Sequence, residues 1–448
     1  LPSSFLPERA GILMEAPSSE RNEGVPMDKK PLPTVASLPL PVYLLALTLT
    51  LLCMVLDCVP PNLVGAFLLL MVLGEGLSKL GNTIPVVKTY LGGSVVCIFG
   101  GALLGYSGLI PAGAAQLMDS FVNQQGFLIF YISALITGSL FSIDRDLLLK
   151  GAVRLVPVGL VSIFSGVMVC GLMGVLGGSS FWDNILYIAV PMTSGGMTAG
   201  TVPLSQTFSE VLGVDSGDIL TRMAPATVLG NCLAIVFAGL LNNLGQRRPE
   251  LTGNGQLVND GQPPRKVDHG KPTLASMMAG LLLSLGFYAL GELCRRFFPV
   301  IPVYAWMVIL IIAVKTLRLM PQQLEDAACH WGDFAIKAWT AAALFGIGVT
   351  LIDLETISHN MTLYYFLTVL VVELVITGVA AGAGKLIGFY PLESAVCGMC
   401  STNMGGSGNV AVLSGAHRME LLPFAQIITR GCGALMLTIG GILVHLVG

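Results

Sequence analysis

Two glycine clusters combine backbone freedom with polar side chains, at Ser194–Gly196 and at Gly405–Gly408. A glycine turn exposes backbone N–H groups, which together with the partial positive charge of a helix N-terminus suit a carboxylate. Carbonyl groups left open at the opposite helix ends suit Na⁺. The pattern therefore predicts binding of a small anion and a cation. The alternative is that these glycines only let helices pack closely.

Arg430 is a basic residue inside an apolar stretch that follows the second cluster. A guanidinium is costly in lipid, and its planar fork can hold a carboxylate through two hydrogen bonds. We expect Arg430 to face the protein interior and bind an anion; an ion pair with Glu420 or a side chain extended to the membrane interface are the alternatives. Arg222 follows the first cluster in the same way but lies nearer a predicted helix end, where the interface alternative is equally open.

Glu373 is a carboxyl group in the middle of another apolar stretch, so it is a candidate for cation coupling or a neutral, hydrogen-bonded side chain. The Cys397-x-x-Cys400 pair has no partner pair, which argues against a metal centre. No Ser/His/Asp or Cys/His set suits a membrane enzyme. We therefore predict a protein that is not an enzyme and has no cofactor beyond a coupling ion.

The composition is that of a polytopic membrane protein. Of 448 residues, 54% are hydrophobic and 11% are charged, against about 25% charged in soluble domains. Mean hydropathy is +0.79. Lys and Arg number 23 against 26 Asp and Glu, so no basic excess is available to bind nucleic acid.

Apolar stretches predict an all-α fold with about eleven transmembrane helices. They are Pro41–Cys58, Asn62–Leu80, Leu91–Ile110, Gly126–Phe141, Leu155–Leu176, Met223–Leu241, Leu274–Leu293, Val303–Leu317, Ala338–Leu354, Leu363–Ala383 and Phe424–Val447. The polar composition of residues 1–38 predicts a disordered tail. Lys and Arg in the loops place the N-terminus in the cytoplasm and the C-terminus outside.

The same loop charges require two further apolar segments to enter and leave the membrane on one side. These re-entrant hairpins are residues 184–207, from the outside, and 387–416, from the cytoplasm. Each hairpin precedes a Thr-Arg pair, Thr221-Arg222 or Thr429-Arg430. We therefore expect two inverted repeats, residues 39–242 (which include the first span) and 273–448, joined by a cytoplasmic loop at residues 243–272. Chance recurrence in a glycine-rich chain is the alternative.

Four segments resemble the 2-hydroxycarboxylate transporter family, bacterial carriers of citrate, malate or lactate coupled to Na⁺ or H⁺. They are STNMGGSGNVAVLSGAHRMELLPFAQIITRGCGA at 401–434, PMTSGGMTAGTVPLSQTF at 191–208, YPLESAV at 390–396 and LNNLGQRRPELTGNGQL at 241–257. The resemblance extends from about Pro39 to the C-terminus. It implies a homodimer in the bacterial inner membrane, with one domain carrying the substrate across and the other forming the dimer contact.

The resemblance also implies roles for particular residues. Substrate binding is expected from Gly196, Met197, Thr198, Met404, Gly405, Gly406, Ser407 and Arg430. Cation binding is expected from Met192, Gly195, Cys400, Asn403 and Thr429. Arg222 and Glu373 are unusual for the family and are possible accessory residues because of their positions in the sequence.

Four positions depart from the pattern of the family's citrate carriers. Met404 stands in place of Arg, Met197-Thr198 in place of Asn-Gly, and Asn409 in place of Asp. We expect a symporter of a 2-hydroxycarboxylate such as malate or citrate with Na⁺, and the lost charge at Met404 favours malate. Proton symport, exchange of precursor for product, and a membrane subunit of a sodium-pumping decarboxylase are the alternatives.

Overall fold

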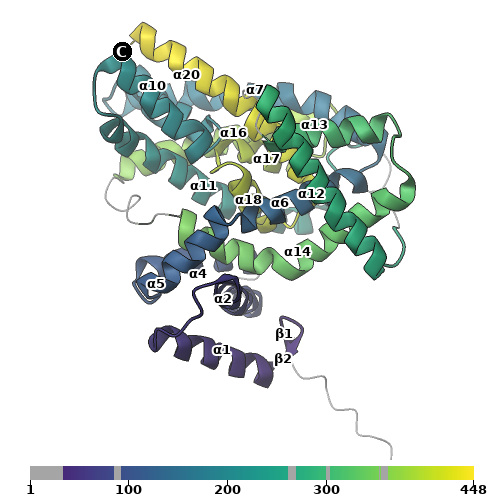
Figure 1. Cartoon of the computed structure of the whole chain (residues 1–448). Helices are drawn as coiled ribbons and strands as arrows, with labels where there is room; N and C mark the ends of the chain where they lie inside the picture. Colours follow the sequence, from purple (N-terminus) through teal and green to yellow (C-terminus); the bar gives the residue numbers. More distant parts are fainter. Residues whose placement is uncertain are drawn as a thin grey trace, which may run out of the picture.

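A computed structural model describes residues 34–84, 92–260, 269–298, 303–352, 354 and 362–447. The described residues are mostly helical, which confirms the expected all-α membrane fold (Figure 1). The longer helices are α1 (Leu40–Val55), α2 (Leu63–Thr83), α4 (Gly92–Tyr106), α6 (Phe127–Ser142), α7 (Arg145–Leu176), α11 (Ser216–Arg247), α12 (Leu274–Phe297), α13 (Val303–Thr316), α14 (Gln322–Leu351), α16 (Leu363–Leu386) and α20 (Gly433–Val447).

Within the described ranges, seven helices are long and apolar enough to cross a bilayer, and the bent pair Ala112–Gln124 and Phe127–Ser142 makes an eighth. Three shorter apolar helices lie at Leu40–Val55, Gly93–Tyr106 and Trp306–Thr316. The total of about eleven spans stays a prediction.

Residues Thr34–Pro39 form a small β-hairpin of β1 (Thr34–Val35) and β2 (Leu38–Pro39), although the expected tail runs to residue 38. The hairpin is ordered because Val35 is buried with Tyr43 of α1 and Val72 of α2. The Tyr43 hydroxyl also donates to the Val72 carbonyl oxygen at 2.7 Å. The first 33 residues of that tail lie outside the described residues.

The connection between α4 and α6 is helical, although the apolar stretches predicted a loop between Ile110 and Gly126. It contains α5 (Ala112–Asp119) and a π-helical turn, η1 (Ser120–Gln124), which meets α6 at an angle of 42°. Phe121 of η1 stacks on Phe127 of α6 with ring centroids 5.1 Å apart. These aromatic contacts hold the short helix against the bundle.

The first expected hairpin is a broken helical segment, residues 181–212. It comprises α8 (Phe181–Asn184), η2 (Ile185–Ala189), α9 (Val190–Thr193), η3 (Met197–Thr201) and α10 (Val202–Leu212). The helix is interrupted at Ser194–Gly196, here called the first break. Gly196 has φ 104° and ψ 178°, a conformation essentially restricted to glycine.

The second expected hairpin is a broken segment at residues 391–415. It comprises α17 (Pro391–Met399), η5 (Cys400–Thr402) and α18 (Gly406–Gly415). The interruption at Asn403–Gly405 is called the second break, and Gly405 has φ 88°. The first helix is broken at the predicted glycine cluster, whereas the second break overlaps its cluster only at Gly405, because Gly406–Gly408 form the first turn of α18. The sides from which the segments enter the membrane stay a prediction.

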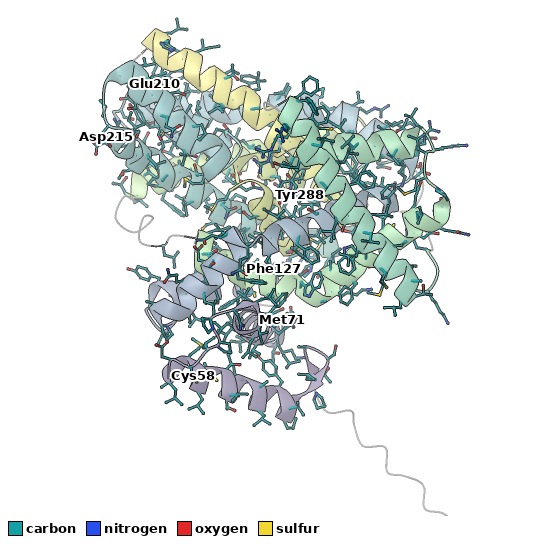
Figure 2. All side chains as sticks on the ribbon, viewed as in Figure 1. Cys58, Met71, Phe127, Glu210, Asp215 and Tyr288 are labelled. Atoms are coloured by element: carbon teal, nitrogen blue, oxygen red, sulfur yellow. The ribbon has the colours of Figure 1, made fainter. Side chains whose placement is uncertain are left out.

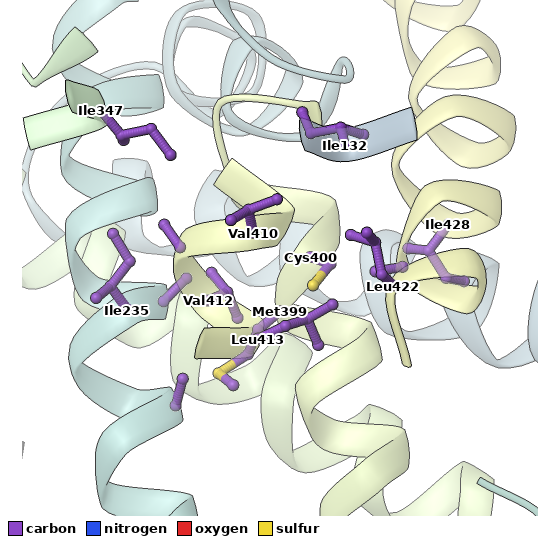
Figure 3. Close-up of a cluster of buried hydrophobic side chains, with 14 of the residues drawn as sticks. Ile132, Ile235, Ile347, Met399, Cys400, Val410, Val412, Leu413, Leu422 and Ile428 are labelled. Carbon is purple, nitrogen blue, oxygen red and sulfur yellow. The ribbon is translucent and has the colours of Figure 1, made fainter. Parts of the chain in front are cut away.

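The second broken segment lies in the middle of the molecule (Figure 1). Figure 3 shows its apolar side chains facing those of α6, α11, α14 and the last helical segment. The labelled residues are Met399, Cys400, Val410, Val412, Leu413, Ile132, Ile235, Ile347, Leu422 and Ile428, and all are buried. Inside a bilayer such packing comes from close van der Waals contact, so the break is held by neighbours on several sides.

The central loop begins later than residue 243, because α11 continues to Arg247. The loop then folds back onto the start of the second broken segment. Val258 pairs with Phe389 as an isolated β-bridge, and the Tyr390 N–H donates to the Leu257 carbonyl oxygen at 3.0 Å. Part of the loop therefore covers one end of this segment.

Candidate functional site

The two breaks touch each other. A Cβ atom built on Gly196 would lie 2.5 Å from the Met404 carbonyl carbon and 2.7 Å from the Gly405 nitrogen. A Cβ atom on Gly405 would lie 3.1 Å from the Gly195 carbonyl oxygen. The clusters lie about two hundred residues apart in sequence, and only glycine permits this approach of the two backbones.

Arg430 lies beside this contact. Its Nη2 atom is 3.6 Å from the position of a Cβ on Gly405. The side chain projects from η7 (Ile428–Cys432), a π-helical turn of the kind common at functional sites. Its Nε atom is buried without a hydrogen-bond partner, and Arg430 makes no ion pair with any described residue. The guanidinium therefore faces the interior with donors available for an anion.

Further polar groups surround the start of α18. A Cβ atom on Gly406 would meet the Tyr304 ring at 3.3 Å and the Gln426 Nε2 atom at 3.6 Å. Ser407, in the first turn of α18, is half-buried. The first N–H groups of a helix have no partner within it, so this helix end offers donors to a carboxylate.

Thr429 places its hydroxyl among three oxygen atoms. The Oγ1 atom is 2.7 Å from the Cys400 carbonyl oxygen, 2.8 Å from Asn409 Oδ1 and 2.8 Å from the Ala425 carbonyl oxygen. A hydroxyl carries one proton and can donate fully to only one of them. The remaining lone pairs form the oxygen-rich surroundings that a small hard cation prefers.

Asn403 fixes the second break against this oxygen cluster. Its Nδ2 atom donates to Asn409 Oδ1 at 2.7 Å, and its Oδ1 atom accepts from the Gly405 N–H at 2.9 Å. Three of the five predicted cation residues, Cys400, Asn403 and Thr429, are therefore brought together. Asn409 also belongs to this cluster, although the citrate carriers to which the sequence was compared have Asp at this position.

The remaining predicted residues belong to the first break. Gly195 contacts this region directly, since its Cβ position is 3.1 Å from the Thr429 carbonyl oxygen. Met192 is buried and packs against Gly230, close to the Thr402 carbonyl oxygen. Met197 is half-buried. The Thr198 side chain lies outside the described part of the structure.

The accessory residues differ in their surroundings. Arg222 is exposed, and its guanidinium carbon lies 3.8 Å from the centre of the Tyr187 ring, where it makes a cation–π contact. Glu373 is completely buried in α16 with the Thr402 side chain beside its carboxyl group. It therefore lies beside η5, the turn that leads into the second break.

Three residues near the breaks escaped the sequence analysis: Asn231, Tyr304 and Gln426. Asn231 Oδ1 accepts from the Met404 N–H at 3.2 Å. Two of them carried a signal, because Asn231 is an amide in the middle of an apolar stretch and Gln426 precedes Arg430 by four residues. Tyr304 comes from α13 and carried none.

A membrane protein whose two broken helices meet beside a half-buried arginine has the architecture of a secondary transporter for a small anion. The chain belongs to the 2-hydroxycarboxylate transporter family, whose model matches residues 35–442. This confirms the family expected from the sequence. The protein is accordingly a transporter rather than an enzyme.

Curated relatives span nearly the whole chain. The citrate transporter CitP of Lactococcus lactis is 37% identical over 86% of this chain and 88% of its own length. The malate transporter MleP of the same species is 34% identical over 92% and 97%. The Na⁺-malate symporter of Bacillus subtilis is 31% identical over 89% and 90%.

Proposed function

We propose that this protein imports a 2-hydroxycarboxylate across the bacterial inner membrane, driven by a Na⁺ gradient. The observation that carries the proposal is the meeting of the two breaks beside Arg430. Anion donors and an oxygen-rich cluster lie within the same contact region, so one protein conformation can bind both an anion and a cation. The N-terminus is in the cytoplasm and the C-terminus outside in this proposal.

The substrate carboxylate binds beside the contact between the two breaks. Arg430 supplies the guanidinium, Ser407 a hydroxyl, and Gly406 belongs to the open helix end. Gly405 and Gly196 allow the two backbones to meet, while Met197, Thr198 and Met404 border the site. Charge-assisted hydrogen bonds of this kind are about twice as strong as neutral ones.

The cation binds at the Thr429 oxygen cluster with Cys400 and Asn403, and Met192 and Gly195 contribute from the first break. Thr429 and Arg430 are neighbours in η7, so a cation that orders Thr429 also fixes the position of the guanidinium. This link supplies the coupling: substrate affinity rises when the cation is bound, and the reverse holds by linkage.

Malate is the preferred substrate in this proposal. Met404 brings no charge to the second break, and the Arg222 guanidinium lies on Tyr187 at 3.8 Å. A trivalent anion needs more compensating charge on leaving water than a divalent one. Proton symport through Glu373 and exchange of precursor for product remain the competing transport modes. We also propose a homodimer.

Uptake into proteoliposomes tests the proposal. Labelled malate and citrate are offered under separately imposed Na⁺ and pH gradients. Malate uptake driven by the Na⁺ gradient alone is the expected result, and Met404→Arg should shift the preference toward citrate. Uptake that follows only the pH gradient would assign coupling to protons. Uptake that requires neither gradient but a carboxylate inside the vesicles would indicate exchange.

A further inference from the structure

Gln426 is a buried amide whose hydrogen-bonding capacity is unused. Its side chain is 1% exposed, and neither the Nε2 nor the Oε1 atom has a hydrogen-bond partner among the described residues. Leaving a buried amide unpaired costs about 1–3 kcal/mol. Such groups in native structures call for an explanation, and a bound ligand is one.

The amide is aimed at the site described above. Its Nε2 atom is 3.6 Å from the Cβ position of Gly406, at the first residue of α18. The Tyr304 ring lies against the same glycine, 3.3 Å from that Cβ position. Tyr288 of α12, labelled in Figure 2, has its ring centroid 6.3 Å from that of Tyr304. The amide therefore lies at the start of α18, where the Tyr304 ring also meets Gly406.

The groups expected to bind the carboxylate are rich in donors. A guanidinium and backbone N–H groups donate only and cannot accept a hydrogen bond from a hydroxyl group, so among these groups only the Ser407 hydroxyl can accept one. The Gln426 Oε1 atom adds a buried acceptor near Arg430, and rotation of the amide by half a turn can present either end. A 2-hydroxycarboxylate carries a donor hydroxyl on the carbon next to its carboxylate.

We propose that Gln426 recognises the 2-hydroxyl group of the substrate, accepting its hydrogen bond while Arg430 binds the adjacent carboxylate. This inference rests on the proposed function and explains how a carrier could distinguish hydroxy acids from plain dicarboxylates. A site built to pair a substrate hydroxyl rejects the analogue that lacks it, because the buried protein group is then left unpaired.

The experiment compares three dicarboxylates as competitors of labelled malate uptake: unlabelled L-malate, succinate and 2-fluorosuccinate. Fluorine nearly preserves the size of the hydroxyl but cannot donate a hydrogen bond. Malate should compete about tenfold or more better than succinate, and 2-fluorosuccinate should compete like succinate. Equal competition by malate and 2-fluorosuccinate would overturn the inference, and this test needs no variant.

Gln426→Met supplies the second arm, since methionine matches the length and lacks both polar atoms. The preference for malate over succinate should fall to within about threefold in this variant, mainly through weaker malate binding. Thr368→Val is the matched control: Thr368 is also fully buried, but its hydroxyl already donates to the Tyr364 carbonyl oxygen at 2.9 Å. Its preference should equal that of the native protein.

The outcomes separate the two proposals. If folded Gln426→Met keeps the native preference, Gln426 does not recognise the hydroxyl, while uptake of malate still supports the proposed function. Binding measured as thermal stabilisation of the purified protein reports the same preference without transport. If the native protein neither binds nor takes up malate or citrate, the proposed function fails and this inference fails with it.

Discussion

Gly196 and Met404 touch through their backbones, which brings the two broken segments into one site. A single methyl group on Gly196 would lie 2.5 Å from the Met404 carbonyl carbon. Real Cβ atoms do not approach backbone so closely, and the backbone of Gly196 is also in a region that other residues avoid. The contact is therefore a sensitive point for testing whether the breaks work together.

Gly196→Ala should lower the maximal uptake rate by about tenfold or more, because the breaks must separate and strain of about 1–3 kcal/mol is added. Uptake in proteoliposomes at matched protein amounts measures this. Gly378→Ala is the control, since a Cβ there meets nothing within 4 Å. Native rates in Gly196→Ala would show that the contact is dispensable.

Arg430→Lys should raise the apparent KM for malate by about 10- to 100-fold, since the charge is kept but the planar fork is lost. The rate at saturating malate should fall less. Arg222→Lys serves as the control because Arg222 is exposed and stacked on Tyr187. An unchanged KM in the Arg430 variant would remove this residue from the substrate site.

Thr429→Val should raise the Na⁺ concentration for half-maximal uptake by about tenfold, because one oxygen ligand is lost with little change in shape. Thr438→Val is a closely matched control, since both hydroxyls donate to the carbonyl oxygen four residues earlier, at 2.8 Å for Thr429 and 3.0 Å for Thr438. If the two variants need the same Na⁺ concentration for half-maximal uptake, Thr429 does not bind the cation.

Arg418→Met should destabilise the protein by about 3–5 kcal/mol, because Glu393 would keep a buried charge without its partner. The Arg418 Nε atom is 2.9 Å from Glu393 Oε1, with the side chains 3% and 0% exposed. Thermal unfolding in detergent measures the effect, and the additional change Glu393→Leu should recover part of it. Arg248→Met, in an exposed pair with Glu250 at 3.6 Å, should change stability by less than about 1 kcal/mol.

The sequence alone determined the class of protein and the position of its irregular backbone. Apolar runs identify spans because lipid offers backbone groups no hydrogen-bond partners, and glycine clusters identify breaks because positive φ angles are a local property. Arg430 was also recognisable, since a charge inside an apolar stretch needs a reason to be there. Each of these inferences depends only on residues close together in the chain.

The tertiary structure decided which polar groups meet. Gln426 and Tyr304 come from separate helices, and their common contact with Gly406 follows from how those helices pack. Arg222 resembled Arg430 in its sequence setting, yet it lies on Tyr187, 3.8 Å from the ring centre. Hydropathy and periodicity describe one helix at a time, whereas a binding site depends on contacts between helices, which the packing of the whole bundle sets.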